Sequence, residues 1–337
     1  MEAAEFYHAS RVIPLLDTRS PAEYEEGHIP GALSFPLFSN DERALVGTTY
    51  KRQGKDEAVK LGLELVGPKL KLWVEQAQEI APAKELALYC WRGGMRSGSM
   101  AWLLQTAGFR VHRLQGGYKA YRTWMRDQFQ KPAQLRCIGG MTGTGKTAIL
   151  HALRERGEQV LDLEGIARHY GSAFGHIHSE GQPTTAHFNN LVLEQWLTLD
   201  HRKRVWVEDE SKHIGKVWLD EGLFQAVKSA PFILLETSMD DRVKWLCEMY
   251  GSTSIEALKE GFTKIGKRLG PQHVKAACAF LDQGDLASAA RIGLEYYDKS
   301  YGHLLGMRQM DYRKLNIAGK THQESAQMLL DEITENG

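Results

Sequence analysis

One cysteine lies in a segment whose composition would make a thiol reactive. Cys90 opens residues 90–97, which read CWRGGMRS and follow an apolar run typical of a strand. A helix-like stretch comes next, so the thiol would lie among backbone N–H groups at a helix N-terminus. Those dipoles, together with Arg92 and Arg96, favour the thiolate and hold an anion beside it. We therefore predict Cys90 as a nucleophile, with Arg92 and Arg96 as its catalytic partners.

The spacing from Cys90 to Arg96 is C-x5-R, which is also the spacing used by cysteine-dependent phosphatases. A loop of this length can enclose a tetrahedral oxyanion, so a phosphatase is the rival hypothesis. Tyr89 stands where many phosphatases have histidine, and the sequence assigns no acidic partner. A chalcogen donor that carries phosphate would satisfy the same loop.

A second motif predicts phosphate binding. Residues 140–147 read GMTGTGKT and match the Walker A pattern G-x4-G-K-S/T, with an apolar strand before and a helical stretch after. The backbone amides would wrap phosphate oxygens, Lys146 would neutralise them, and the Thr147 hydroxyl would ligate Mg²⁺. The predicted phosphate-binding residues are Gly140, Thr142, Gly143, Thr144, Gly145, Lys146 and Thr147.

Three carboxylates end a later apolar strand. Glu208, Asp209 and Glu210 follow residues 205–207, at the place from which P-loop proteins hold Mg²⁺. Periodicity does not choose among the three, and Thr147 with Glu208 is the predicted metal pair. A solvated charge cluster at a strand end is the alternative interpretation.

Length and composition limit what these motifs can belong to. The 337 residues exceed what one hydrophobic core usually organises, so two domains are expected. The 42 basic and 42 acidic residues cancel, so nucleic acid would bind only through local basic patches. Four scattered cysteines argue against a zinc site and favour a reducing cytoplasm, with Cys137, Cys247 and Cys278 as buried structural residues. No leader or membrane-spanning segment is predicted.

The elements that must position these motifs predict an α/β fold in both halves. The polar stretch around Pro132 gives a boundary, so we predict domains at 1–128 and 135–337 with a linker at 129–134. From Asp240 onward the pattern is chiefly helical. The predicted strands are 12–16, 86–89, 135–138, 159–163, 205–207 and 232–235, in mostly parallel sheets, and the predicted helices include 69–80 and 185–199.

Two further segments give the first half a family resemblance. Residues 17–32, DTRSPAEYEEGHIPGA, resemble the N-terminal signature of the rhodanese family, and residues 114–121, LQGGYKAY, resemble its closing Gly-Gly segment. With the cysteine loop, three motifs occur in that family's order and cover most of residues 8–125. The resemblance implies a rhodanese-like α/β domain, followed by a P-loop NTPase-like α/β domain with a helical C-terminal part.

Over nearly its full length the chain resembles the tRNA 2-selenouridine synthase family. Arginine is common in that family where Tyr170 stands, so a cationic role is not carried over to this position. The segments that carry the resemblance are 41–50, 139–147, 161–165, 171–175, 207–215 and 296–301.

This resemblance implies an enzyme that acts on wobble 2-thiouridine of tRNA. Geranyl diphosphate would geranylate the sulfur, and selenium from selenophosphate would then replace the geranylthio group to give 2-selenouridine. Alkylation turns a poor leaving group into a thioether that departs as a thiol. Cys90 would receive or position selenium, whereas Lys146, the loop amides and Mg²⁺ would stabilise the pyrophosphate. No redox cofactor is implied.

The motif and the resemblance predict different P-loop ligands. The motif alone predicts ATP or GTP. The resemblance predicts geranyl diphosphate, which we favour and which requires an apolar channel beside the loop, with Met141 and residues 171–177 as expected walls. The competing hypotheses are a cysteine phosphatase fused to an NTPase, and a regulatory module whose first domain only binds a partner.

Several surface features are candidates for tRNA contacts or a lid. The basic clusters are Arg110, His112 and Arg113; Lys119, Arg122 and Arg126; Arg202, Lys203 and Arg204; and Lys264, Lys267 and Arg268. Each could equally be a solvated face. Tyr296, Tyr297 and Tyr301 could stack on bases or pack in a helical core. His176, His178 and His187 lie near a stretch that could form a lid or an ordinary surface loop.

Overall fold

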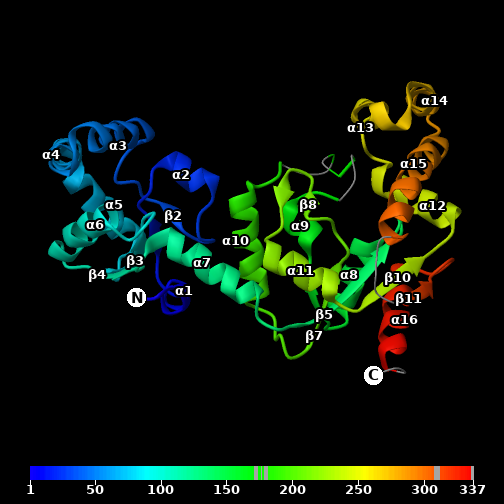
Figure 1. The fold of residues 1–337 in the computed structure, drawn as a ribbon, viewed down its shortest axis with the longest axis horizontal. Helices are drawn as coiled ribbons and strands as arrows, with labels where there is room; N and C mark the ends of the chain where they lie inside the picture. Colours follow the sequence, from blue (N-terminus) through cyan, green and yellow to red (C-terminus); the bar gives the residue numbers. More distant parts are fainter. Residues whose placement is uncertain (171–173, 176, 178–180, 307–311, 335–337) are drawn as a thin grey trace. The chain divides into compact units, whose positions relative to one another are not determined.

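The computed structural model describes residues 1–170, 174, 175, 177, 181–306 and 312–334. The chain divides into two compact units, Met1–Phe129 and Gln130–Gly337 (Figure 1). Each unit is built around its own parallel sheet, which confirms the predicted α/β class. Within the described residues, no helix is long and apolar enough to cross a membrane.

The sheet of the first unit has the strand order β2-β1-β3-β4 with every pair parallel. Its strands are β1 (Leu15–Asp17), β2 (Leu33–Ser34), β3 (Glu85–Tyr89) and β4 (Arg110–Arg113). Because Asp17 pairs with Tyr89 in register, the residues that follow β1 and β3 meet at one edge of the sheet. Cys90 therefore lies beside the segment that begins at Thr18.

The helices of the first unit cover this sheet. They are α1 (Ala3–Ala9), α2 (Pro21–Glu26), α3 (Asn40–Gln53), α4 (Lys55–Val66), α5 (Leu70–Ile80), α6 (Met95–Thr106) and α7 (Gly117–Phe129), with a 3₁₀ turn at Gly67–Lys69. The apolar faces of α3 to α6 and the strands form one core that includes Leu16, Trp73, Leu88 and Met100. Burial of these large apolar side chains is the main stabilising contribution to the unit.

The sheet of the second unit has the order β11-β10-β5-β7-β6, again all parallel. Its strands are β5 (Gln134–Gly140), β6 (Gln159–Leu161), β7 (Arg204–Glu208), β10 (Phe232–Glu236) and β11 (Arg313–Asn316). A separate antiparallel hairpin pairs β8 (His213–Ile214) with β9 (Val217–Trp218). β5 and β7 are neighbours, so the P-loop and the carboxylates after β7 lie at the same sheet edge.

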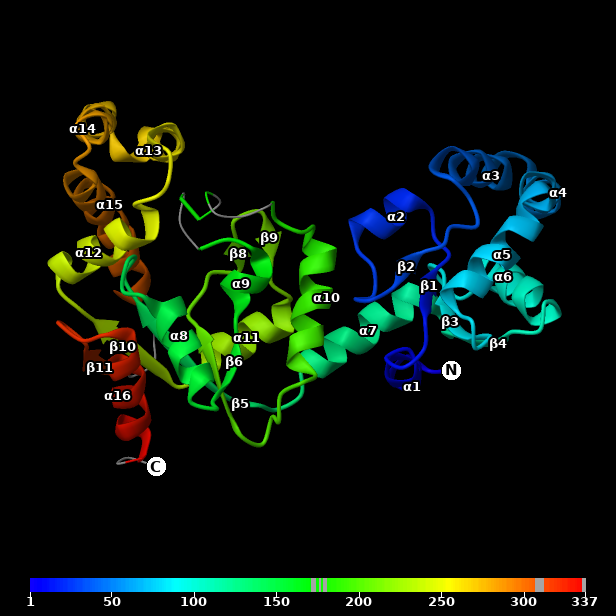
Figure 2. The same ribbon diagram turned by 180° about the vertical axis from the view of Figure 1, so that it is seen from behind.

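Helices flank this sheet and extend beyond it. They are α8 (Lys146–Glu155), α9 (Leu163–Ala167), α10 (Thr185–Trp196), α11 (Glu221–Ser229), α12 (Met239–Tyr250), α13 (Ile255–Leu269), α14 (Pro271–Asp282), α15 (Leu286–Gly306) and α16 (His322–Thr334). Figures 1 and 2 place α12 to α15 together as a helical group. α16 meets this group at its first residue, where the His322 ring lies 4.2 Å from the Trp245 ring of α12. α16 packs against α8, the helix that follows the P-loop.

Several predicted boundaries were wrong for identifiable reasons. Val12 belongs to the turn after α1, where its N–H bonds to the Ala9 carbonyl, so β1 begins only at Leu15. β6 ends at Leu161 because Asp162 caps α9, accepting a hydrogen bond from the Gly165 N–H at 2.8 Å. The predicted helices 69–80 and 185–199 are Leu70–Ile80 and Thr185–Trp196.

The region after Asp240 is chiefly helical, as predicted, but it also contains β11, which pairs with β10 as an edge strand whose charged residues tolerate solvent. Among the cysteines expected to be buried, Cys137 is buried, but Cys247 and Cys278 are half-buried. All four cysteines, Cys90 included, are free thiols.

Candidate active sites

Cys90 lies directly after β3 in a short loop that leads into α6. Its side chain is only 3% exposed, and its Sγ lies 3.1 Å from the Oγ of buried Ser97. Either atom can be the donor of this hydrogen bond, and the Ser97 hydroxyl also donates to the Gly94 carbonyl at 3.3 Å. Ser97, the last residue of the predicted loop, is thus the polar side chain that directly contacts the cysteine.

The closing Gly-Gly segment fixes this loop. The N–H of Tyr118 donates to the Cys90 carbonyl at 2.8 Å, and the N–H of Lys119 donates to the Trp91 carbonyl at 3.0 Å. The contact requires glycine at position 117, because a Cβ there would lie 2.3 Å from the Cys90 carbonyl oxygen and its φ is +63°. The two motifs therefore form one structural unit, which explains why both accompany the cysteine.

Arg96 is held by an acidic residue that the sequence did not identify. Its guanidinium donates to both carboxylate oxygens of Glu23, at 2.5 and 3.2 Å. Burial alone would raise the pKa of Glu23, but the hydrogen bonds and charge of Arg96 outweigh it, and the pKa is lowered. Arg92 is exposed and pairs with no acidic residue in the described part of the chain. Of the two predicted anion-binding arginines, only Arg96 is held in place by a carboxylate in the described part of the chain.

A buried ion pair lies beneath the cysteine loop. Arg19, only 1% exposed, donates to both oxygens of the Asp17 carboxylate and also to the Gly27 carbonyl at 2.7 Å. Tyr89 donates its hydroxyl to Asp17 at 2.7 Å, and burial raises its pKa well above the ordinary value. The Tyr89 hydroxyl also accepts a hydrogen bond from the Ile29 N–H at 3.1 Å, so Tyr89 joins the Asp17 carboxylate to the segment after α2.

The P-loop connects β5 to α8 in the geometry that the motif predicted. Gly143 and Gly145 both adopt left-handed φ values, +81° and +80°. The ammonium of Lys146 donates to the Gly140 carbonyl at 3.0 Å, closing the loop on itself. A Cβ at position 145 would lie 2.5 Å from the Nε2 of His322, which comes from the start of α16. The C-terminal helix thus leaves room for glycine only.

Glu164 is the carboxylate that contacts the P-loop. The Thr147 hydroxyl donates to its Oε2 at 2.7 Å, and its backbone N–H donates to Glu208 at 2.7 Å. Glu208 is fully buried, so a solvated cluster is the wrong interpretation for this residue, and its second oxygen has no partner in the described structure. Asp209 is paired with Lys228 at 2.7 Å. Glu208, the last residue of β7, and Asp209, the residue after it, therefore have different environments.

The carboxylates beside the P-loop have too little positive charge around them to offset their burial. Burial and the neighbouring Glu164 raise the pKa of Glu210 to about 8, although Lys146 opposes the shift. Burial, together with the Asp162 and Glu164 charges, raises the pKa of Glu208 well above its ordinary value. A cation at this place would relieve both effects.

No group of three or more His, Cys, Asp or Glu side chains forms a complete metal site within the described residues. A P-loop Mg²⁺ needs fewer protein ligands, because phosphate oxygens and waters complete its octahedron. Thr147, Glu164 and Glu210 offer hard oxygen donors, and Glu208 has an orphaned buried oxygen. These residues fit Mg²⁺, with Glu164 as a candidate beside the predicted pair of Thr147 and Glu208.

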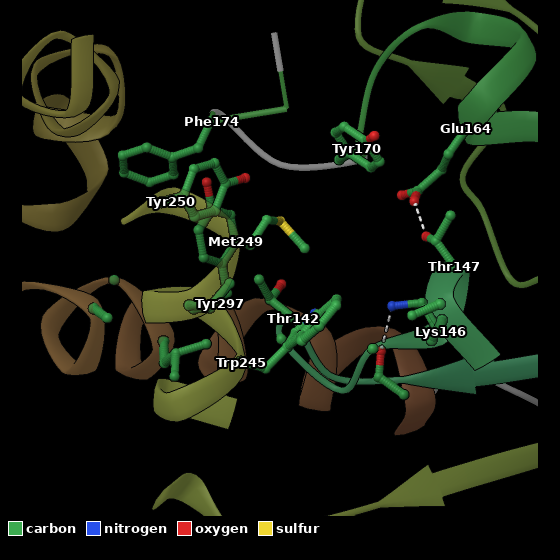
Figure 3. Close-up of a pocket in the computed structure, with 18 of the residues that line it drawn as sticks. Thr142, Lys146, Thr147, Glu164, Tyr170, Phe174, Trp245, Met249, Tyr250 and Tyr297 are labelled. Atoms are coloured by element: carbon green, nitrogen blue, oxygen red, sulfur yellow. Dashed lines mark hydrogen bonds between the residues drawn. The ribbon is translucent and has the colours of Figure 1, made fainter. Parts of the chain in front are cut away.

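A pocket of about 350 Å³ runs from the P-loop into the helical group. Figure 3 shows Lys146, Thr147 and Glu164 at one end, with Phe174 and Tyr250 at the opposite end. Between these ends the walls are largely apolar. They include Trp245, Leu246, Met249, Leu258, Phe262, Leu286, Ala290, Leu294 and Tyr297. A ligand that fills this pocket has an anionic end and an apolar end.

The expected walls were partly right. Phe174 lines the pocket and packs edge-on against Phe262, with ring centroids 5.0 Å apart. Met141 is absent from the described lining, and its sulfur lies 3.5 Å from Arg242. Residues 171–173 and 176 lie outside the described residues, as do His178 and the Tyr301 side chain. Tyr297 lines the pocket, and His187 lies in the first turn of α10.

Arg242 joins the P-loop to the helical group, and sequence analysis did not identify it. The side chain is 4% exposed, and its Nε donates to the Thr142 carbonyl at 2.8 Å. Its two terminal nitrogens donate to both oxygens of Asp298 in α15, at 2.5 and 2.9 Å. The phosphate loop and the apolar walls are therefore fixed to each other.

Many residues of the predicted basic clusters already have acidic partners. The pairs are Arg110 and His112 with Glu85, Arg202 with Asp200, Arg204 with Glu158, and Lys264 with Glu260. Lys203 is exposed, and so is Lys216 in the β8–β9 hairpin. The tRNA-binding surface stays a prediction.

Family models match both units. Residues 2–123 match the rhodanese-like domain, and residues 133–332 match the model described as tRNA 2-selenouridine synthase AAA domain. A tRNA 2-selenouridine synthase of Sulfurovum sp. is 34% identical over 319 residues, which cover 87% of this chain and 85% of that protein. One from Bordetella bronchiseptica is 36% identical over 353 residues, with 92% of each chain covered.

Solved structures resemble parts of the chain. The N-terminal domain of a putative ATP/GTP binding protein from Clostridium difficile is 44% identical, covering 35% of this chain and 94% of that one, with a TM-score of 0.33. A tRNA isopentenylpyrophosphate transferase from Bacillus halodurans is 12% identical, covering 60% of this chain and 96% of that one, with a TM-score of 0.34.

Proposed function

The chain belongs to the tRNA 2-selenouridine synthase family, and we propose that it makes 2-selenouridine in two steps at two separate loops. In the P-loop unit, geranyl diphosphate alkylates the sulfur of wobble 2-thiouridine. At the Cys90 loop, selenium from selenophosphate then replaces the geranylthio group. Family membership sets aside the phosphatase and regulatory-module hypotheses. A cytoplasmic location is part of the proposal.

The pocket beside the P-loop is the observation that supports the first step of this proposal. Its walls beyond the phosphate loop are aromatic and aliphatic side chains such as Trp245, Met249 and Phe262. An isoprenoid tail gains free energy by burying its apolar surface there, whereas a nucleotide base and ribose would leave polar groups without partners. The combination of P-loop and apolar pocket therefore favours a prenyl diphosphate over ATP or GTP.

The first step forms one bond and breaks another. The sulfur of 2-thiouridine attacks the first carbon of the geranyl chain, the carbon–oxygen bond breaks, and pyrophosphate leaves with the electron pair. Loss of the N3 proton then makes the alkylated base neutral. Lys146 and the loop amides stabilise the negative charge that develops on the leaving oxygens. Mg²⁺, held by Thr147 with Glu164 or Glu208, would add Lewis-acid stabilisation of the same charge.

The discriminating experiment omits nucleotide. Wild-type enzyme, thiolated tRNA, Mg²⁺ and geranyl diphosphate should yield geranylated nucleoside, detected by mass spectrometry after digestion of the tRNA. Excess ATP should slow the reaction only weakly, because its base and ribose do not match the apolar walls. A strict ATP requirement, with geranyl diphosphate unable to compete for the nucleotide site, would restore the ordinary NTPase interpretation.

A further inference from the structure

The oxidation level of selenium restricts what Cys90 can do in the second step, given the selenophosphate donor proposed above. Selenium is fully reduced both in selenophosphate and in the selenouridine product. A thioselenide on the Cys90 sulfur would hold selenium more oxidised by one electron pair. No oxidant takes part in the reaction, so a thioselenide intermediate does not balance. Attack on the phosphorus of the donor needs no change in oxidation level.

The loop is built to hold a phosphoryl group beside the thiol. The backbone N–H groups of Arg92, Gly93 and Gly94 donate to no atom in the described part of the chain. The neighbouring carbonyls of Cys90 and Trp91 are instead bound by the N–H groups at the start of α7. Backbone donors without acceptors, in the loop that directly follows the thiol, are available to bind an oxyanion.

The side chains of the loop complete this arrangement. Glu23 fixes the Arg96 guanidinium by two hydrogen bonds, so a planar donor is pre-oriented at the end of the C-x5-R segment. The Ser97 hydroxyl, 3.1 Å from the Cys90 sulfur, can donate to the thiolate before attack and to the sulfur when it departs. Each of these features serves displacement at phosphorus, and none requires a covalent bond to selenium.

We propose that Cys90 cleaves selenophosphate through an S-phosphocysteine. The thiolate attacks phosphorus, the S–P bond forms, and the P–Se bond breaks with its electron pair remaining on selenium, which leaves as hydrogen selenide anion. Hydrogen selenide anion then attacks C2 of the geranylated base, its proton passes to N3, and the C2–S electron pair leaves with geranylthiolate. Water cleaves the S–P bond and returns the thiolate with inorganic phosphate.

This chemistry does not require an acidic residue that protonates the leaving group. Hydrogen selenide is a far stronger acid than an alcohol, so its anion leaves phosphorus without a general acid. Glu23, the carboxylate that contacts the loop arginine, is committed to Arg96 and has a lowered pKa. An ordinary phosphatase must protonate an alkoxide leaving group. The enzyme should therefore cleave selenophosphate and leave alkyl phosphates intact.

The test asks which atom of the donor stays on the protein. Enzyme is mixed with selenophosphate labelled either in phosphorus or in selenium, without tRNA or geranyl diphosphate, then denatured rapidly and digested. We expect phosphorus but not selenium on the peptide that contains Cys90. Ser97→Ala should prolong the labelled state about tenfold or more, because one hydrogen bond to a charged sulfur is lost. Cys90→Ser should abolish labelling, whereas the matched control Cys278→Ser should not change it.

Two results would overturn the proposal. One is retention of selenium without phosphorus; the other is absence of any label in wild type and Ser97→Ala while selenium insertion proceeds. Because neither tRNA nor geranyl diphosphate is present, the result does not depend on geranylation. An enzyme that is labelled by phosphorus but never geranylates tRNA would contradict the proposed function and leave the S-phosphocysteine intact.

Discussion

The cysteine loop and the P-loop share the same backbone arrangement. Each follows a parallel strand, curves through glycines and leads into a helix whose N-terminus attracts an anion. The two loops differ in the side chains that lie beside the predicted anion-binding position. One has a buried thiol with a fixed guanidinium, whereas the other has carboxylates and an apolar pocket. In the mechanism proposed above, the same backbone arrangement presents phosphorus to a nucleophile in one unit and holds a departing diphosphate in the other.

The strongest test of this comparison is to remove the nucleophile. Cys90→Ser should lower selenium insertion by about 10³-fold or more, because a hydroxyl at this position is not ionised. Geranylation should be nearly unchanged, so geranylated tRNA should accumulate. Mass analysis of tRNA nucleosides measures both products in one sample. Normal selenouridine formation by the variant would remove Cys90 from the mechanism.

The converse variant acts on the other loop. Lys146→Ala should reduce geranylation about 10²- to 10³-fold, because a charge that stabilises the leaving pyrophosphate is lost. Selenium insertion into tRNA that has been geranylated beforehand should continue at the wild-type rate. An equal loss of both reactions would mean that the two loops do not work separately.

The pocket gives a graded prediction. A Cβ at Gly293 in α15 would lie 3.6 Å from the Phe262 ring, so Gly293→Ala should be tolerated. Gly293→Leu should occupy space for the tail and weaken geranyl diphosphate binding about tenfold or more, the equivalent of one or two buried methylene groups. Calorimetric titration with inorganic pyrophosphate is the internal control, since its affinity should not change. Equal weakening of both ligands would place the tail elsewhere.

The raised pKa of Glu210 predicts a pH effect on stability. Between its ordinary value of 4.5 and about 8, the folded protein binds a proton that the unfolded chain has lost, so the free energy of unfolding falls as pH rises. Glu210→Gln should flatten this dependence by up to about 1.4 kcal/mol per pH unit. Denaturant unfolding in the presence of a chelator measures it. The exposed Glu221→Gln is the control, and an identical slope in both variants would contradict the prediction.

The smallest expected effect is on the salt dependence of tRNA binding. Binding should weaken steeply with salt despite zero net charge, because phosphate contacts release counterions. Since Arg202 and Arg204 are paired with carboxylates, Lys203→Glu tests that cluster without breaking an ion pair. One lost contact should reduce the slope of log affinity against log salt by about one. A salt-independent affinity would argue against backbone-dominated binding, whereas an unaffected Lys203 variant would only relocate the patch.

The sequence predicted those features that depend on residues close together along the chain. The strand–loop–helix arrangement of both motifs, the parallel sheets and the family could be predicted because local spacing determines them. Glu23, Glu164 and Arg242 could not, because each reaches its partner across the fold. The separate environments of Glu208, Asp209 and Glu210 follow from tertiary burial, which consecutive positions do not reveal.

The ion pair between Arg242 and Asp298 has a consequence for how such a protein could evolve. The carbonyl of Thr142, inside the phosphate motif, depends on a guanidinium in α12 that is itself held from α15. A P-loop domain that acquired these helices by recombination would have needed both charged residues and the accommodating loop at once. The helical group is therefore not an interchangeable module, and a chimera with another P-loop protein should fail unless all three segments come from one parent.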